Sequence, residues 1–389
     1  MYPDLSYFFH DVFNTPYDNA ASIFKTYGLF LALAFLTAAL VVYMELKRKE
    51  QEGVIQPMVV TKKNANGVSF SSIIINTLIG FVLGFKLFYI LSHFDAFKAD
   101  GAGVVFSGDG SWPGGLIIGL LYGGYTYWNW RRSKKDSEKE TSITIHPYEK
   151  TGDITIIAAI SGIVGARLFS ILENLDLFFQ DPMGQIFSGS GLTVYGGLIL
   201  AFIVVYFYIK KLGIPVMHMM DIAGMAIILG YGIGRMGCHF SGDGDWGIVN
   251  EMAKPSWFIL PDWMWSYDYP HNVINEGIPI EGCTAKYCHR LSPGVFPTSV
   301  YETIVSILIF IFLWLVRKRI KIAGFLFFMY LVFNGVERFL IETIRVNDKY
   351  NYFGFEWSQA QYISVGLVII GIAGMFILLR KNKYSLKGG

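Results

Sequence analysis

The chain has 389 residues, of which 53% are hydrophobic and only 16% are charged. A soluble domain carries roughly 25% charged residues, so this composition excludes an ordinary soluble fold and indicates a membrane protein. The formal net charge of +2 gives no indication of a nucleic-acid partner.

Apolar runs long enough to cross a bilayer as helices, about 20 residues each, recur along the whole chain. We therefore predict an all-α polytopic membrane protein with about nine transmembrane helices that form a single domain over residues 1–389. The predicted spans are 27–46, 72–93, 113–130, 153–173, 193–209, 216–238, 298–316, 322–342 and 360–379.

The distribution of Lys and Arg predicts the orientation. The loops 47–71, 131–152, 210–215, 317–321 and 380–389 hold 21 of the 32 basic residues, and all of them fall on one side of the predicted membrane. Because basic loops remain in the cytoplasm, we expect the N-terminus outside and the C-terminus in the cytoplasm. The polar, charge-mixed loops 47–71 and 131–152 are interpreted as solvated linkers.

An internal repeat is expected in the first half of the chain. Residues 84–97 match residues 165–178, with Lys86 aligned to Arg167, and a Gly-Gly-Leu sequence follows in both copies. The hairpin 72–130 therefore resembles a duplicate of 153–209. The alternative is a chance match between two membrane segments that are both rich in Gly and Phe.

The stretch 234–247 combines Arg235 with a Gly-rich, acidic and aromatic sequence at the end of an apolar run. Glycines allow the backbone to approach a ligand, and an arginine fork suits a phosphate group. The alternative is a helix C-cap and turn, with Arg235 reaching towards the interface.

Residues 239–297 are predicted to form an extracytoplasmic lid. The segment is rich in Trp and Tyr, which favour the headgroup layer of a bilayer, although a small packed cap without a ligand would have the same composition. Cys283 and Cys288 are expected to form a disulfide outside the cytoplasm. A metal site that includes His289 is the weaker alternative, because two thiols and one imidazole are too few ligands.

Asn334, Arg338, Glu342 and Arg345 have the spacing of residues that share one helical face. Charged groups in a membrane helix are costly, so such a row implies a polar cavity or a partner helix. An Arg338–Glu342 pair that only joins two helices is the alternative. Two arginines against one acceptor on this face leave positive charge, which favours an anion site.

Polar segments from five predicted spans lie at the outer ends of those spans. They are Tyr27, Tyr195, the loop 235–247, the sequence 297–302 and the face 338–345. We therefore expect a cationic, lipid-accessible pocket for a phosphate group at the outer leaflet.

These residues resemble the motifs of the prolipoprotein diacylglyceryl transferase family. The Gly-Arg-x-Gly sequence at 234–237, followed by an acidic Trp-Gly turn, is similar to the family signature. The runs 191–198, 297–302 and 337–345 are similar to its other blocks in the same order, and 27–29 to its first-helix motif. The resemblance does not cover residues 50–150, which contain the additional hairpin.

The resemblance implies transfer of the diacylglyceryl group of phosphatidylglycerol to the lipobox cysteine thiol of a prolipoprotein, with release of glycerol phosphate. It implies a catalytic domain at the outer leaflet of a bacterial inner membrane. The expected partners are phosphatidylglycerol, the prolipoprotein signal peptide and membrane lipid, with no cofactor, no metal ion and no nucleic acid. We expect a monomer.

By position in the motifs, Arg235 and Arg338 would hold the phosphate and Glu342 would orient Arg338. Either Asp243 or Asp245 stands where the family has an acidic residue. The expected catalytic residues are Arg235, Arg338, His239 and Tyr195. The expected substrate-binding residues are Tyr27, Arg167, Asp243, Asp245, Gly247, Tyr301, Asn334, Glu342 and Arg345.

The chain departs from the family pattern at Tyr195, Cys238 and Phe296, where the family usually has histidine, asparagine and histidine. The pKa of tyrosine is about 10, so we interpret Tyr195 as a hydrogen-bond donor rather than a base. His239 is the better base, with His271 second, although a lone histidine is more often structural.

Two other functions compete with the transferase. Intramembrane charges and a Gly-interrupted repeat also occur in transporters and flippases for anionic lipids or solutes. A non-catalytic relative that binds prolipoproteins is the third interpretation, and the departures at Tyr195 and Cys238 are its support.

Overall fold

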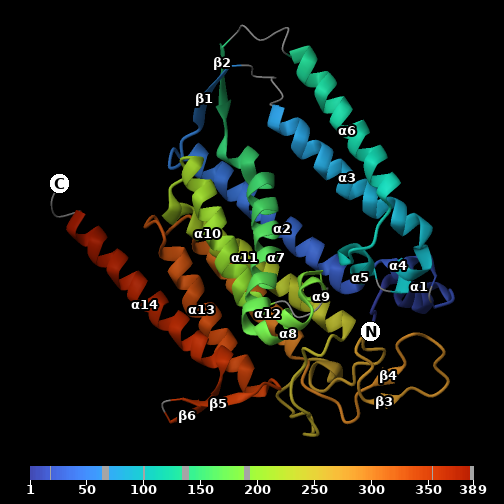
Figure 1. Ribbon diagram of the computed structural model, residues 1–389. Helices are drawn as coiled ribbons and strands as arrows, with labels where there is room; N and C mark the ends of the chain where they lie inside the picture. The colour runs from blue at the N-terminus through green and yellow to red at the C-terminus, as the bar shows by residue number, and fades with distance from the viewer. Residues whose placement is uncertain are drawn as a thin grey trace. The chain divides into compact units, whose positions relative to one another are not determined.

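The computed structural model describes residues 1–17, 19–63, 70–99, 101–133, 140–187, 193–352 and 354–385 (Figure 1). The chain divides into two compact units, one of residues 1–49 with 214–389 and one of residues 50–213. Residues 188–192, which include part of the predicted repeat copy 153–209 and the first two residues of the 191–198 motif, lie outside the described residues.

The prediction of an all-α, multi-pass membrane protein is confirmed. Within the described residues, six helices are long and apolar enough to cross a membrane. They lie at Thr26–Gln51, Ser72–Ser92, Pro147–Glu173, Val216–Ser241, Thr298–Val316 and Gln359–Lys383. The remaining three predicted spans fall on helices α6 (Trp112–Ser133), α10 (Val194–Lys211) and α13 (Phe325–Ile341).

The first unit contains the helices that carry the candidate site. Its helices are α1 (Leu5–Phe13), α2 (Thr26–Gln51), α11 (Val216–Ser241), α12 (Thr298–Val316), α13 (Phe325–Ile341) and α14 (Gln359–Ser385). Short 3-10 turns are η1 (Ala20–Ile23), η4 (Asp262–Met264) and η5 (Glu342–Ile344), and the strands are β3 (Ile278–Pro279), β4 (His289–Arg290), β5 (Lys349–Tyr352) and β6 (Phe355–Ser358).

Helices α11, α12 and α13 pack against one another, and α14 packs along α13 (Figure 1). Their core includes Ile222, Met225, Ile228 and Leu313, all fully buried. Asp221, near the start of α11, accepts hydrogen bonds from the backbone N–H groups of Gly324 at 2.9 Å and Phe327 at 3.0 Å. This buried carboxylate therefore caps the start of α13, at the opposite end of α11 from Arg235.

Helix α11 continues beyond the predicted end at residue 238. It runs to Ser241 and ends at Gly242, whose φ of 62° is the left-handed conformation of a C-cap. Gly237 does not end the helix; a Cβ atom there would lie 2.9 Å from Cβ of Phe30, so the glycine allows α2 to approach α11 closely. The predicted loop therefore begins at Gly242, and Arg235 lies within the helix.

The lid has a small core of its own. Trp246, Tyr269, Leu291 and Val295 form a buried cluster, against which Tyr267 packs. Strands β3 and β4 pair in antiparallel fashion. Cys283 and Cys288 form a disulfide with a Cα–Cα distance of 5.6 Å.

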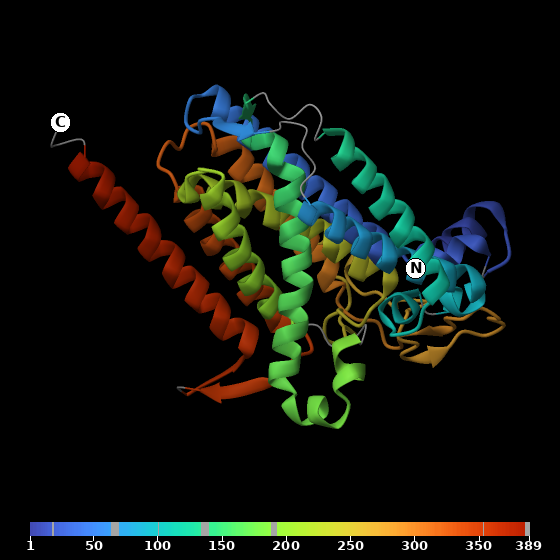
Figure 2. The same ribbon diagram turned by 45° about the horizontal axis from the view of Figure 1, so that its top comes forward.

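The second unit contains two helical hairpins. Its elements are β1 (Met58–Lys63), α3 (Phe70–Ser92), α4 (Phe94–Ala99), α5 (Gly101–Phe106), α6 (Trp112–Ser133), β2 (Glu140–Ile145), η3 (Pro147–Lys150), α7 (Thr151–Glu173), α8 (Leu175–Gln180), α9 (Pro182–Phe187) and α10 (Val194–Lys211). Helix α3 packs on α6, and α7 packs on α10. Figure 2 shows the short helices α8 and α9 at the end of α7.

The two predicted linkers are not structureless. Residues 58–63 and 140–145 pair as the antiparallel strands β1 and β2, with Met58 opposite Ile145. Val59 and Thr144, which lie opposite each other in this pairing, are β-branched residues, a type that favours strands.

Candidate active site

Glu302 lies at the centre of the candidate site. It belongs to the second turn of α12 and its side chain is fully buried. Its carboxylate pairs with Arg338 of α13 at 3.0 Å and with Arg345 at 3.2 Å, and it also contacts Nε of Arg235 on α11. One carboxylate therefore collects three guanidinium groups from two neighbouring helices and from the segment that follows η5.

Asp245 is a second acceptor for the same arginines. Its carboxylate contacts Arg235 and lies 2.5 Å from Arg345. Its backbone carbonyl accepts hydrogen bonds from the hydroxyls of Thr298 at 3.1 Å and Ser299 at 3.0 Å. The loop after α11 is thereby fixed to the first turn of α12.

Arg338 is the most accessible of the three arginines. Its side chain is 26% exposed, compared with 8% for Arg235 and 9% for Arg345. It also pairs with Glu342 at 3.3 Å, the orienting contact that the sequence predicted. A ligand that reaches this cluster would therefore meet the guanidinium of Arg338 before the other two.

The prediction that the face with Arg338, Glu342 and Arg345 carries excess positive charge is wrong. That expectation counted only the acceptor that lies on the same helix, whereas Glu302 from α12 and Asp245 from the loop also pair with the arginines. Three arginines face three carboxylates, so the cluster is balanced. The arginines still present a dense group of donors, but an anion has to compete with these carboxylates.

The prediction that Asn334, Arg338, Glu342 and Arg345 share one face of a single helix is also wrong. Helix α13 ends at Ile341, and Glu342 opens the 3-10 turn η5. Arg345 follows the turn in an extended conformation and forms a β-bridge with Gly247. Arg345 therefore reaches Glu302 through the turn rather than from the helix. Asn334 lies one helical turn before Arg338 and is half-buried.

Close backbone packing explains the Gly247 position. A Cβ atom there would lie 2.6 Å from the carbonyl oxygen of Ile344, 2.8 Å from Cγ2 of Thr298 and 2.9 Å from Cβ of Phe296. Any side chain would separate the loop from α12 and from the segment that carries Arg345. Tyr27 of α2 packs against Gly237 of α11, where a Cβ atom would lie 3.5 Å from Cα of Tyr27.

Asp243 and Asp245 differ in their electrostatic environment. Burial raises the pKa of Asp243, and the neighbouring charge of Asp245 adds to this effect. Burial would also raise the pKa of Asp245, but the charges of Arg235 and Arg345 outweigh it and lower that pKa to about 2. Two nearby carboxyls with pKa values shifted in opposite directions are a common arrangement in acid–base sites.

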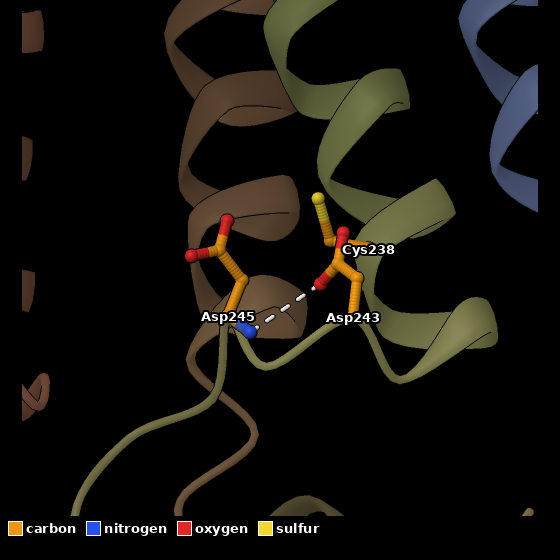
Figure 3. A group of neighbouring side chains, drawn as sticks. All are labelled: Cys238, Asp243 and Asp245. Carbon is orange, nitrogen blue, oxygen red and sulfur yellow. Dashed lines mark hydrogen bonds between the residues drawn. The ribbon is translucent and has the colours of Figure 1, made fainter. Parts of the chain in front are cut away.

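Cys238, Asp243 and Asp245 lie close together, with ligand atoms within 4.8 Å of one another (Figure 3). The backbone N–H of Asp245 donates to the carboxylate of Asp243 at 3.3 Å. The group has the ligand types of a metal site, but Arg235 and Arg345 already pair with Asp245. Their positive charge opposes a cation, so we assign no metal here.

His239 is enclosed by aromatic rings. Nδ1 lies 3.2 Å from the hydroxyl of Tyr269, and the imidazole contacts the rings of Phe240, Trp263, Tyr267 and Tyr269. Because the side chain is buried, these contacts join the last turn of α11 to the lid.

The structure brings the predicted residues Arg235, Asp245, Arg338, Glu342 and Arg345 together in one cluster. Other predicted residues lie outside this cluster. Tyr301 turns to the lid, where its hydroxyl donates to the carbonyl of Met264 at 2.5 Å. His271 also belongs to the lid, with Nδ1 2.7 Å from the carbonyl of Tyr287. Arg167 on α7 and Tyr195 on α10 belong to the second unit.

Glu302 is the residue that the sequence analysis missed. The signal was present, because an acidic residue within an apolar span is a functional candidate by default. Glu337 is a second buried carboxyl, and within the described residues neither of its oxygens has a hydrogen-bond partner.

The fold and this cluster define a multi-pass membrane protein with a buried network of arginines and carboxylates at one end of its helices. A profile of the family described as prolipoprotein diacylglyceryl transferase matches residues 115–377. The chain belongs to this family, as the motifs indicated.

Curated relatives agree with this assignment. A protein of Clostridium botulinum is 31% identical over 238 residues, which are 61% of this chain and 83% of the relative. A protein of Dehalococcoides mccartyi is 28% identical over 236 residues, covering 61% of this chain and 79% of the relative. A protein of Lysinibacillus sphaericus is 26% identical over 243 residues, which are 62% of this chain and 81% of the relative. All three are named phosphatidylglycerol–prolipoprotein diacylglyceryl transferase.

Proposed function

We propose that this chain transfers the diacylglyceryl group of phosphatidylglycerol to the cysteine thiol of a prolipoprotein lipobox and releases glycerol phosphate. Family membership supports the reaction class. The observation that carries the proposal is the convergence of Arg235, Arg338 and Arg345 on Glu302. Such preorganised donors stabilise the charge that develops on a departing phosphate.

The proposed topology has nine crossings, with the N-terminus outside and the C-terminus in the cytoplasm of a bacterial inner membrane. The side of the basic loops supports this orientation. The lid follows α11 and precedes α12, so it lies on the same side as the arginine cluster. In this orientation both face the outer leaflet, where exported prolipoproteins and phosphatidylglycerol meet.

Arg338 is the proposed first contact for the lipid phosphate, since it is the most exposed of the three arginines. Arg235 and Arg345 would then exchange part of their pairing with Asp245 for the phosphate as negative charge grows. Tyr27 and Gly247 would lie beside the headgroup, and Asn334 and Glu342 would hold the Arg338 side of the site. The roles of Arg167 on α7 and Tyr195 on α10, which belong to the second unit, stay predictions from the motif resemblance.

Asp243 is the proposed acceptor of the thiol proton. In the part of the chain that the structure describes, the ion pairs of Arg235 and Arg345 go to Asp245 and Glu302 and not to Asp243, whose raised pKa suits a base. The lipobox sulfur attacks the glyceryl carbon that bears the phosphate, the C–O bond breaks, and its electron pair leaves with glycerol phosphate. The thiol proton passes to Asp243 and then to water. His239 is proposed to position the lid, because aromatic rings enclose it.

The hairpin 72–130 is proposed to be a duplicate of 153–209. The glycine contacts of the two hairpins correspond: a Cβ atom on Gly84 would lie 2.3 Å from the carbonyl oxygen of Gly114, and one on Gly165 would lie 2.4 Å from that of Gly196. The backbone bonds Ser111 N–H to Phe85 O and Thr193 N–H to Ala166 O also correspond.

The additional copy is proposed to serve as a scaffold rather than as a second site. Its Lys86 donates to the backbone carbonyls of Ser107 at 2.5 Å and Asp109 at 2.8 Å, so the ammonium group holds the connection into α6. Pro113 takes the place of Tyr195 in the alignment, so this copy lacks the hydroxyl.

The direct test uses the purified protein in vesicles that contain phosphatidylglycerol, with a synthetic lipobox peptide. Mass spectrometry should detect a diacylglyceryl thioether on the cysteine, together with free glycerol phosphate. A peptide whose lipobox cysteine is replaced by serine is the control and should remain unmodified. Peptide binding without any product would contradict the transferase and support the non-catalytic interpretation.

A further inference from the structure

The aromatic residues of the lid separate into two groups that the sequence alone does not distinguish. Trp246 and Tyr269 are buried in the small core of the lid. The segment 252–260, here called the lid tip, instead exposes its apolar side chains. Trp257 is 72% exposed and Ile259 is 90% exposed, and Met252 and Leu260 are also exposed.

The lid tip is held in place at its base. Lys254 pairs with Asp262 at 2.7 Å, which closes the loop. The indole N–H of Trp265 donates to the carbonyl of Met252 at 2.9 Å, and Asn250 donates to the carbonyl of Trp265 at 2.6 Å. The ring of Phe258 lies 5.1 Å from that of Trp265. The apolar side chains are therefore presented outward by an ordered base.

The base of the lid tip lies at the level where two membrane helices end. Trp263 contacts His239 in the last turn of α11, with ring centroids 5.7 Å apart. The carbonyl of Met264 accepts a hydrogen bond from the hydroxyl of Tyr301, in the first turns of α12. The turn η4 therefore packs beside the helix ends, and the lid tip directly precedes it.

We propose that the lid tip inserts into the lipid headgroup layer of the leaflet in which α11 and α12 end. Trp side chains favour this layer, and Ile, Leu and Met beside Trp257 favour the acyl chains beneath it. The only charged residue from 252 to 260 is Lys254, a cation that suits an anionic lipid surface. We name lipid as the occupant of this exposed apolar surface, because the base of the lid tip packs beside the ends of the membrane helices α11 and α12.

The test is independent of turnover and therefore of the proposed reaction. The full chain carrying Ile259→Cys is labelled with an environment-sensitive fluorophore and placed in vesicles of phosphatidylcholine and phosphatidylglycerol. Labelling is selective, because Cys238 is buried and Cys283 and Cys288 form a disulfide. Glu281→Cys, exposed elsewhere in the lid, is the matched control.

In vesicles, the label at 259 should emit at shorter wavelength, be quenched by spin-labelled lipids and resist quenching by aqueous iodide. The label at 281 should be quenched by iodide and not by the spin-labelled lipids. Bromolipid quenching of intrinsic fluorescence should fall in Trp257→Phe but not in Trp246→Phe. Iodide access without lipid quenching at 259 would overturn the proposal. A blue shift at 259 that appears only after addition of lipobox peptide would also overturn it, because the peptide would then be the occupant.

Discussion

Glu302 on α12 and Arg338 on α13 are joined by an ion pair of 3.0 Å, and the carboxylate of this pair is fully buried. The pair links α12 to α13 at the level of the candidate site. The side chain of Arg338 is still partly exposed, so the same contact orients the arginine and leaves part of it accessible to a ligand.

Glu302→Gln should therefore impair both stability and transfer. The change leaves three mostly buried arginines with one acceptor fewer, and breaking a buried pair costs about 3–5 kcal/mol. We expect a lower melting temperature and a fall in kcat/KM of about 10²–10³-fold from disordered phosphate donors. Glu337→Gln is the matched control on the neighbouring helix, because its carboxyl has no hydrogen-bond partner within the described residues. Equal losses in the two variants would contradict the central role of Glu302.

Arg235→Lys should lower transfer without abolishing the positive charge. A lysine ammonium cannot contact Glu302, Asp245 and Ser299 at once as the Arg235 fork does. The expected loss in kcat is about 10²–10³-fold, measured in the vesicle assay. Arg290→Lys, on the exposed surface of the lid, should leave kcat unchanged. Normal activity of Arg235→Lys would rule out the fork assignment.

Asp243→Asn and Asp245→Asn should have different effects. Loss of the proposed base at 243 should lower kcat by about 10²–10⁴-fold, and the activity of the unmodified protein should fall as pH drops through the raised pKa of Asp243. Asp245→Asn should mainly lower the thermal stability, since it removes a partner of Arg235 and Arg345.

The pH dependence of stability checks the Asp245 environment separately. Its folded-state pKa is lowered from 3.8 to about 2, so its stabilising contribution is complete above pH 3.8 and is lost as pH falls through 2. Melting curves of the unmodified protein and of Asp245→Asn should therefore converge at acid pH. A constant difference between them down to pH 2 would show that the carboxylate is not stabilised by these arginines.

His239→Gln distinguishes a positioning role from a base. With Asp243 as the acceptor, this variant should retain most of kcat, while the pH profile of kcat remains that of the unmodified protein. Its weaker packing against Trp263 and Tyr269 should appear as a lower melting temperature. Loss of the acid limb of the pH profile would instead identify His239 as the base.

Gly247→Ala should destabilise the loop that carries Asp245. The added methyl group would lie 2.6 Å from a backbone carbonyl, which cannot be relieved by a side-chain movement. Such overpacking costs about 1–3 kcal/mol, and we expect a lower melting temperature together with lost activity. Gly366→Ala on α14 is the control, because nothing lies within 4 Å of a Cβ atom there. Wild-type behaviour at position 247 would show that the loop tolerates the displacement.

The sequence by itself determined the class of fold and the likeness to the family, and it singled out Arg235 and Arg338 as candidate site residues. Long apolar runs have to form helices in a bilayer, and a charged residue within such a run is costly enough to mark a site. These features are local, so they are readable without knowing which helices are neighbours. The spacing of Cys283 and Cys288 is local in the same sense.

The tertiary structure decided how the charges are distributed. Glu302 lies 36 residues from Arg338 and Asp245 lies 100 residues from Arg345, so no periodicity within one helix could pair them. The contrast between Asp243 and Asp245, and the division of the lid aromatics into a core and an exposed tip, arise in the same way. Each depends on which groups from distant segments surround a side chain, because burial and Coulomb interaction act through space rather than along the chain.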